Sequence, residues 1–268
     1  MKKILSIIAF AALMLAVTSC DKIDINNTHK PYTPSSSGKT VLIKDFTGVR
    51  CVNCPGAAET AHELQHQLGE DRVFIMSVHA GSLAMPVGKF PDFRTEEGTL
   101  WYNENSSNPL FAVDHVSLTE GNTLNVSQID AAVGDALTEP QVFNIAIEND
   151  YNEASRELKV RNTFTVNGDG DATYYATVCL MEDSIVGRQV VPGGVDTAYV
   201  FRNVFRGTLN GADGEMFSNS AIYPADEFTV NCTTTIDSVY NADQCYILTY
   251  IYDNKDGKII HTGMAKIK

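Results

Sequence analysis

The feature that most constrains this chain is a pair of cysteines, Cys51 and Cys54, between a short apolar run and a helical pattern. Residues 40–46 are rich in β-branched and apolar side chains, which is typical of a buried strand. From Pro55 onward the apolar positions step by four, three and four residues, which predicts a helix capped at Gly69. Because proline is tolerated only in the first turn of a helix, this helix is expected to begin at the cysteines.

That position has a chemical consequence for the two thiols. At a helix N-terminus, unpaired N–H groups and the helix dipole stabilise a thiolate, so Cys51 is a candidate nucleophile. Cys54 follows one turn later, close enough to form a disulfide with Cys51. Three interpretations are possible: a redox-active pair, a structural disulfide of an exported protein, or half of a zinc site. No second Cys-x-x-Cys or suitably spaced histidine pair completes a zinc site, so we expect no metal and no cofactor.

The N-terminus carries an export signal. Lys2 and Lys3 precede an apolar run at residues 4–17, which is too short for a comfortable membrane span. Small residues then lead to Cys20, an arrangement that resembles a bacterial lipoprotein signal in which the cysteine is lipidated. We therefore predict a signal peptide at residues 1–19 and a lipid on Cys20. A plain signal peptide with an incidental cysteine is the alternative.

The segment after the signal and the overall charge limit the partners. Residues 20–38 are rich in Ser, Pro, Asn and Thr without apolar periodicity, which predicts a flexible tether. The chain has a net charge of −13, which argues against nucleic acid because phosphates attract basic surfaces. The charge is compatible with a secreted or surface protein. The expected partners are the membrane, through the lipid on Cys20, and other envelope or surface proteins.

The periodicity of the sequence changes after Pro140. Apolar and polar residues then alternate, as they do in half-buried antiparallel strands. Roughly seven such strands without a helical stretch predict an immunoglobulin-like β-sandwich over residues 140–268. Three cysteines in this half, Cys179, Cys232 and Cys245, are predicted to be buried and unpaired. A cross-link between Cys232 and Cys245 is the alternative.

Residues 44–54, KDFTGVRCVNC, resemble the active-site frame of thioredoxins at Asp45, at the next phenylalanine and at both cysteines. The resemblance implies that Asp45 is a buried acid that moves the proton of the second cysteine. It also implies that a cis proline opening a later strand faces the dithiol, and Pro109 is the candidate. The frame lacks the tryptophans and the Gly-Pro of that family, which leaves the direction of redox chemistry open. Residues 39–139 are accordingly expected to form an α/β thioredoxin-like domain, with a second buried strand at residues 72–79.

Four segments carry a second resemblance. They are DFTGVRCVNCPGAA from Asp45, SVH from Ser77, NPLFAVDH from Asn108 and FRNVFRGTLNGADGE from Phe201. Together they are similar to the outer-membrane-protein-28 family, lipoproteins of Bacteroidetes with a thioredoxin-like domain and a C-terminal β-domain. The resemblance implies a cell-envelope location as an outer-membrane lipoprotein. The expected fold class is an α/β thioredoxin-like domain followed by an all-β immunoglobulin-like sandwich.

The sequence leaves two functions open. In the first, the chain is an envelope lipoprotein that exchanges disulfides with exported proteins, a thiol–disulfide oxidoreductase. Cys51 would then be the nucleophile, Cys54 the resolving thiol and Asp45 the proton acceptor. In the second, it is a non-enzymatic binding, accessory or adhesin lipoprotein that uses the same fold as a scaffold with a structural disulfide. The spacing of the acid and the cysteines favours the first, whereas the missing tryptophans and the attached β-domain favour the second.

Overall fold

A computed structural model of the protein describes residues 38–102 and 107–268. The predicted signal peptide, almost all of the predicted tether, and the lipidation site Cys20 lie outside the described residues. No helix within the described ranges is long and apolar enough to cross a membrane.

The secondary structure of the described residues is mainly strand. The first strands are Val41–Thr47 (β1), Val73–His79 (β2), Leu110–Val113 (β3), Phe143–Tyr151 (β4), Glu157–Val166 (β5), Tyr174–Glu182 (β6) and Ile185–Val191 (β7). They are followed by Gly194–Phe201 (β8), Val204–Thr208 (β9), Glu215–Ser218 (β10), Glu227–Thr235 (β11), Cys245–Asp253 (β12) and Lys258–Lys266 (β13). The α-helices are Cys54–Leu68 (α1), Glu96–Trp101 (α2) and Ile129–Leu137 (α3), and single-turn 3-10 helices lie at Ser82–Ala84 (η1), Val126–Gln128 (η2) and Ala242–Gln244 (η3).

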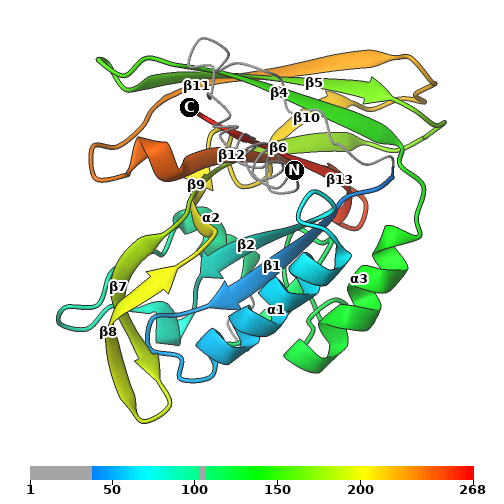
Figure 1. Ribbon diagram of the computed structural model, residues 1–268. Helices are drawn as coiled ribbons and strands as arrows, with labels where there is room; N and C mark the ends of the chain where they lie inside the picture. The colour runs from blue at the N-terminus through cyan, green and yellow to red at the C-terminus, as the bar shows by residue number, and fades with distance from the viewer. Residues whose placement is uncertain (1–37, 103–106) are drawn as a thin grey trace, which may run out of the picture.

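The largest sheet joins the two halves of the chain. Its strands follow the order β13-β12-β6-β9-β2-β1-β3, and β10 pairs with β6 beside this path. Strands β1 and β2 are parallel, whereas β3 runs antiparallel to β1. The junction between the halves is the parallel pairing of Ser77 on β2 with Val204 on β9. A mixed sheet therefore continues from the N-terminal half into the C-terminal half (Figure 1).

Two further sheets complete the architecture. A three-stranded sheet, β11-β5-β4, lies over β6, β12 and β13, and its inward residues share an apolar core with them (Figure 1). Helices α1 and α3 lie on one side of β1 and β2, where Ala57, Ala61 and Leu64 of α1 pack against Val41 and Ile43. The third sheet is the hairpin of β7 and β8, which projects beside the start of α1.

The predicted fold class, an α/β thioredoxin-like domain followed by an all-β immunoglobulin-like sandwich, is wrong. Among the described residues the α-helices number only three, with 15, 6 and 9 residues, and the largest sheet mixes parallel and antiparallel strands. The physical reason is that every residue of β1 and β2 is buried, so both faces of these strands need a cover. Helices cover one face. The other face packs against β6, β9 and β12 of the second half.

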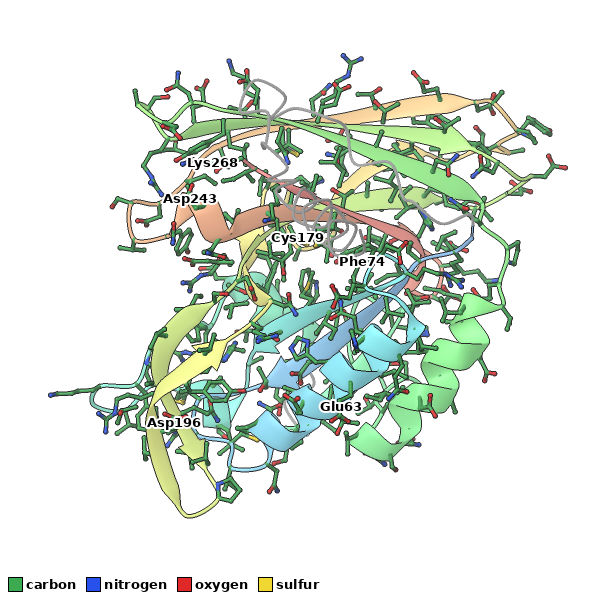
Figure 2. The ribbon with its side chains drawn as sticks, viewed as in Figure 1. Glu63, Phe74, Cys179, Asp196, Asp243 and Lys268 are labelled. Atoms are coloured by element: carbon green, nitrogen blue, oxygen red, sulfur yellow. A yellow bond between two sulfur atoms is a disulfide. The ribbon has the colours of Figure 1, made fainter. Side chains whose placement is uncertain are left out.

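The shared core lies between the halves of the chain. Phe74 of β2 and Cys179 of β6, both labelled in Figure 2, belong to it. The predictions for the three later cysteines are confirmed, because Cys179, Cys232 and Cys245 are buried and free. The predicted helix start is confirmed as well, since α1 begins at Cys54 with a proline in its first turn. Local periodicity therefore predicted the elements better than their assembly.

Candidate functional site

The two cysteines of the Cys-x-x-Cys motif form a disulfide with a Cα–Cα distance of 5.4 Å. Cys54 is the first residue of α1, and Cys51 lies in the turn that precedes it. The amide of Cys51 donates to the carbonyl of Gly48 over 3.0 Å, which closes that turn. Both side chains are only 2% exposed. The structure thus brings the predicted pair together, but it buries the sulfur atoms.

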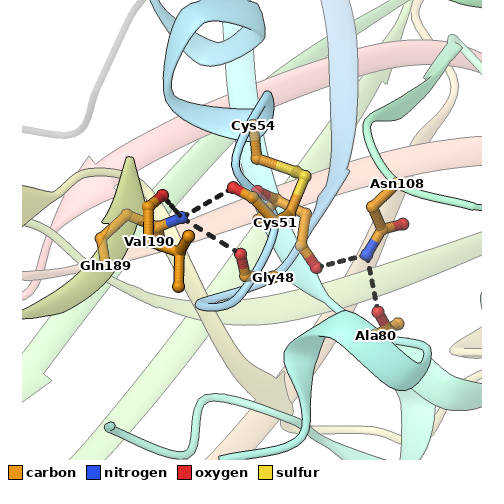
Figure 3. The surroundings of a disulfide bond; sticks show 8 residues. Gly48, Cys51, Cys54, Ala80, Asn108, Gln189 and Val190 are labelled. Carbon is orange, nitrogen blue, oxygen red and sulfur yellow. Dashed lines mark hydrogen bonds between the residues drawn. A yellow bond between two sulfur atoms is a disulfide. The ribbon is translucent and has the colours of Figure 1, made fainter. Parts of the chain in front are cut away.

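The cover over this turn comes from the β7–β8 hairpin. The side-chain amide of Gln189 on β7 donates to the carbonyl oxygens of Cys51 and Val190, each over 3.0 Å (Figure 3). It also donates to the carbonyl of Gly48 over 3.3 Å, and the Val190 amide donates to Val49 over 2.9 Å. Sequence analysis missed Gln189. No local pattern marks a residue that reaches the motif across 138 positions.

Asp45 is the predicted acid of the site, and it is 1% exposed on β1. Its Oδ1 has no hydrogen-bond partner among the described residues. Burial raises the pKa of Asp45 to about 7. Near neutral pH its carboxyl can therefore either donate or accept a proton.

Asp45 and Cys54 line the same cavity, which has a volume of about 320 Å³. The cavity lies between α1 on one side and β8 on the other, with the ends of β1 and β2 as its floor. The lining residues are Asp45, Thr47, Cys54, Pro55, Ala58, Glu59, His62, Ser77, His79, Gln189, Tyr199, Val200, Phe201 and Arg202. The predicted acid and one cysteine of the disulfide thus line a common space.

His79 lies at the floor of this cavity, at the end of β2. Burial, together with the nearby Arg206 guanidinium, lowers the pKa of His79 to about 3, so the imidazole is neutral. Its ring packs edge-on against Phe93, with ring centroids 4.9 Å apart. The Nδ1 atom has no hydrogen-bond partner among the described residues. The floor therefore presents two buried polar groups, one from Asp45 and one from His79.

Pro109 is the last predicted site residue in the described part. The Asn108–Pro109 peptide bond is cis, as the resemblance implied. The side chain of Asn108 donates to the carbonyls of Thr47 and Ala80, each over 2.8 Å, and so ties the start of β3 to the ends of β1 and β2 (Figure 3). Pro109 itself does not line the cavity. It directly precedes Leu110 of β3, which pairs with Phe46 near the end of β1, just before the turn that leads to Cys51.

The arrangement is suited to sulfur chemistry. No group of three or more potential metal-ligating His, Cys, Asp or Glu side chains occurs within the described ranges. A disulfide at a helix start, beside an acid with a pKa near 7, can support thiol–disulfide exchange because a thiolate must form at one sulfur.

Comparisons with known proteins locate the chain among its relatives. The model of a family described as outer membrane protein Omp28 matches residues 114–268, more than half of the chain. The structure of HBP35 of Porphyromonas gingivalis is similar with a TM-score of 0.66 at 15% identity, over 87% of this chain and 76% of that one. A domain of the outer membrane lipoprotein Omp28 from the same organism matches with a TM-score of 0.35 at 20% identity, over 47% of this chain and 88% of that one. No curated protein matches the sequence.

These matches bear on different parts of the molecule. The similarity to HBP35 concerns the fold alone, and it extends over most of both chains. The family match begins at Asp114, after the disulfide and after β3. The chemistry of the disulfide must therefore be argued from the site itself.

Proposed function

This chain belongs to the Omp28 family of outer membrane proteins, and on that premise we propose that it exchanges disulfides with exported proteins in the cell envelope. The family sets the location at the outer membrane. A lipid on Cys20 would attach the chain there, and the described part would act on polypeptides that pass through the same compartment. The proposed exchange activity, unlike the location, is argued from the disulfide site.

The observation that carries the proposal is the common cavity of Cys54 and Asp45. Disulfide exchange needs a group that gives a proton to the leaving sulfur and later takes one back. Asp45 is suited to this because burial raises its pKa to about 7.

The reaction can be written from the disulfide form. A thiolate of the substrate attacks Sγ of Cys51, the Cys51–Cys54 bond breaks, and Cys54 leaves as a thiol with the proton of Asp45. A second substrate thiol then gives its proton to Asp45, attacks the mixed disulfide and displaces Cys51 as a thiolate, which takes up from water the proton that the first substrate thiol had released. The substrate leaves as a disulfide, having lost two electrons and two protons, and the protein becomes a dithiol. The reverse sequence reduces a substrate disulfide, and the relative potentials decide the direction.

A second candidate function follows from burial. Both cysteines are 2% exposed, and the amide of Gln189 holds the turn that carries them. A disulfide protected in this way also suits a binding or accessory lipoprotein in which the bond only stabilises the fold. The two functions predict different redox behaviour.

The deciding experiment is the reduction potential of the Cys51–Cys54 pair in the purified mature protein, equilibrated in glutathione or dithiothreitol buffers. A potential between about −120 and −270 mV, with catalysis of insulin reduction, supports exchange. A value below about −300 mV without turnover assigns the pair a structural role. Cys54→Ser should trap mixed disulfides through Cys51 in cells, whereas Cys179→Ser, at a buried free thiol, serves as the matched control.

A further inference from the structure

The cavity beside the disulfide runs along the edge of a strand. The last three residues of β8, residues 199–201, line it together with Arg202, which follows the strand. Side chains of successive residues point to opposite faces of a strand, so one face alone would contribute every second residue. We infer from this run of consecutive residues that the backbone edge of β8 borders the cavity.

The opposite wall is a stripe of α1. It consists of Cys54, Pro55, Ala58, Glu59 and His62, which recur at helical spacing. Glu59 on this wall and Val200 on the other are exposed, so the cavity opens to solvent between them. The space is therefore a groove with a helix on one side and a strand edge on the other, and Cys54 lies at one end of the helical stripe.

The strand edge in this groove has no partner strand. Within the described ranges β8 pairs only with β7, in a two-stranded sheet. A strand with a free edge presents unpaired N–H and C=O groups, and such edges are templates for a further strand. Strand β8 contains no proline that would interrupt pairing. Addition of an extended peptide to such an edge is a general mode of polypeptide recognition.

The floor of the groove also lacks partners. Oδ1 of Asp45 and Nδ1 of His79 have no hydrogen-bond partner among the described residues, and their side chains are 1% and 3% exposed. Both residues line the groove. Buried polar atoms without partners cost free energy, so a ligand that reaches the floor gains by pairing with them.

We propose that this groove binds an extended polypeptide segment that carries a cysteine, added as a strand to the free edge of β8. The main chain of the segment pairs with residues 199–201, and its cysteine lies toward the Cys51–Cys54 disulfide at the start of α1. This inference rests on the proposed function and assigns it a substrate class, unfolded cysteine-containing chain rather than folded protein.

The test measures binding without redox chemistry. The probes are fluorescent eight-residue peptides with β-branched flanks and a central S-methylcysteine, which cannot exchange, and the readout is fluorescence anisotropy with the purified mature protein. Two N-methylated versions of each peptide remove alternate sets of backbone donors. Strand addition predicts that one set weakens binding at least tenfold and the other changes it little, because alternate amides of a strand point to the same edge. Equal effects of both sets, or no binding by any peptide, would overturn the proposal.

Two variants test whether the peptides bind in the groove. Ala58→Phe puts a ring into the groove from the helical wall and should weaken peptide binding at least tenfold. Glu63→Phe adds the same ring to an exposed position of α1 outside the groove and should leave binding unchanged (Figure 2). Circular dichroism checks that both variants are folded. Wild-type binding by a folded Ala58→Phe would contradict the assignment.

The two proposals fail separately. If the reduction potential of the cysteine pair lies below about −300 mV but the protein still binds the peptides with the alternating N-methylation pattern, the redox proposal fails and the peptide site stands. A redox-active pair in a protein that binds none of the peptides keeps the function and removes the site.

Discussion

The side-chain amide of Gln189 donates a 3.0 Å hydrogen bond to the main-chain carbonyl of Cys51, from a hairpin in the second half of the chain. Together with the bond from Val190 to Val49, it fastens the β7–β8 hairpin to the turn that carries the disulfide. Exchange requires a sulfur atom to be approached along the S–S bond. A hairpin of the second half of the chain therefore holds the turn that carries the disulfide of the first half.

Loss of the Gln189 amide should make the disulfide easier to reduce. Gln189→Ala removes three side-chain hydrogen bonds to carbonyls. If opening the hairpin becomes easier by about 1–2 kcal/mol, the rate of reduction by dithiothreitol rises about five- to thirtyfold. The rate of thiol release with a chromogenic reagent measures this. Gln67→Ala, at an exposed position of α1, is the control, and an unchanged rate for Gln189→Ala would show that the hairpin does not limit access.

Replacement of the buried acid should stabilise the protein at neutral and alkaline pH. The pKa of Asp45 is about 7 in the folded protein and near 3.8 when unfolded. Between these values the folded state binds more protons, so the wild type loses stability as pH rises from about 4 to 7. Asp45→Asn should remove that loss and gain on the order of 2–4 kcal/mol above pH 7, but little below pH 4. Urea unfolding at several pH values tests this, with exposed Asp150→Asn as the control.

This prediction would be contradicted if Asp45→Asn raised the unfolding free energy by the same amount at pH 4 and at pH 8. Such a gain would reflect packing or hydrogen bonding, not ionisation of the carboxyl.

The buried lysine of β1 should produce the opposite pH dependence. Nζ of Lys44 donates to the Val116 carbonyl over 2.8 Å and lies 3.7 Å from the centre of the Trp101 ring. Burial lowers the pKa of Lys44 to about 7, against 10.5 in the unfolded chain. The unfolded state thus binds more protons between these values, so wild-type stability should rise from pH 7 to about 10.

Lys44→Met should remove this rise. Relative to this variant, the wild type should gain on the order of 2–4 kcal/mol of unfolding free energy as the pH rises over that window. Tyr250→Phe removes one oxygen partner of the lysine but keeps the amine, so it should retain the rise. A pH-independent difference for Lys44→Met would mean that the amine keeps its charge throughout.

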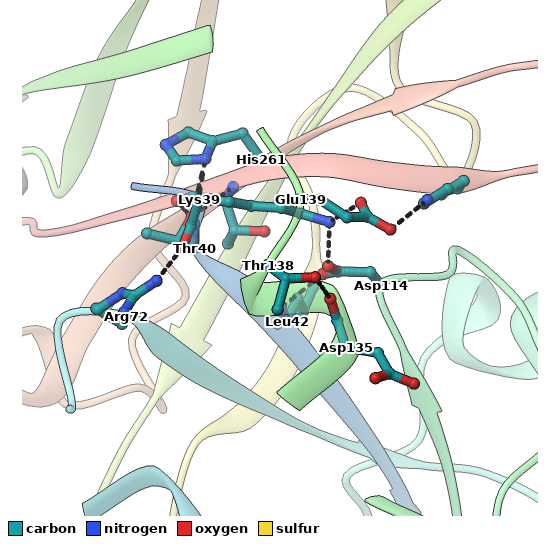
Figure 4. Close-up of polar contacts among 11 residues, drawn as sticks. Lys39, Thr40, Leu42, Arg72, Asp114, Asp135, Thr138, Glu139 and His261 are labelled. Atoms are coloured by element: carbon teal, nitrogen blue, oxygen red, sulfur yellow. Dashed lines mark hydrogen bonds and ion pairs between the residues drawn. The ribbon is translucent and has the colours of Figure 1, made fainter. Parts of the chain in front are cut away.

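Breaking the buried ion pair just before β1 should cost more unfolding free energy than breaking an exposed one. Nζ of Lys39 lies 2.8 Å from Asp114 and 2.7 Å from Glu139, and its side chain is 1% exposed (Figure 4). Lys39→Met leaves the buried Asp114 carboxyl without its cation and should cost about 3–5 kcal/mol. Lys159→Met, whose pair with Glu157 is 59% exposed on the lysine side, should change stability by less than about 1 kcal/mol. Equal losses in urea unfolding would argue against the buried pair.

Several elements follow from local sequence. The helix at Cys54 starts where proline can be accommodated, and the apolar steps that follow keep one side of α1 on β1. Alternation in β5 gives inward Leu158 and Val160, as its period of two requires. These features depend on neighbours only a few residues away, so the pattern carries the information.

The assembly of the sheets does not follow from such patterns. Ser77 and Val204 are neighbours across the two halves, and nothing local in either segment marks the other as its partner. Strand pairing over long sequence separations is decided by which surfaces remain uncovered once the local elements have formed. The expected fold class, a thioredoxin-like domain followed by an immunoglobulin-like sandwich, was wrong for this reason.

The sequence by itself determined that Cys51 and Cys54 lie at a helix start with Asp45 on the preceding strand, because spacing along the chain fixes those positions. Tertiary structure alone decided the surroundings of that pair. It buried the sulfurs beneath a hairpin held by Gln189 and set Cys54 and Asp45 in a groove beside the edge of β8. The physical reason is that burial and solvent access depend on contacts between segments far apart in the chain, whereas helix and strand starts depend on residues next to one another.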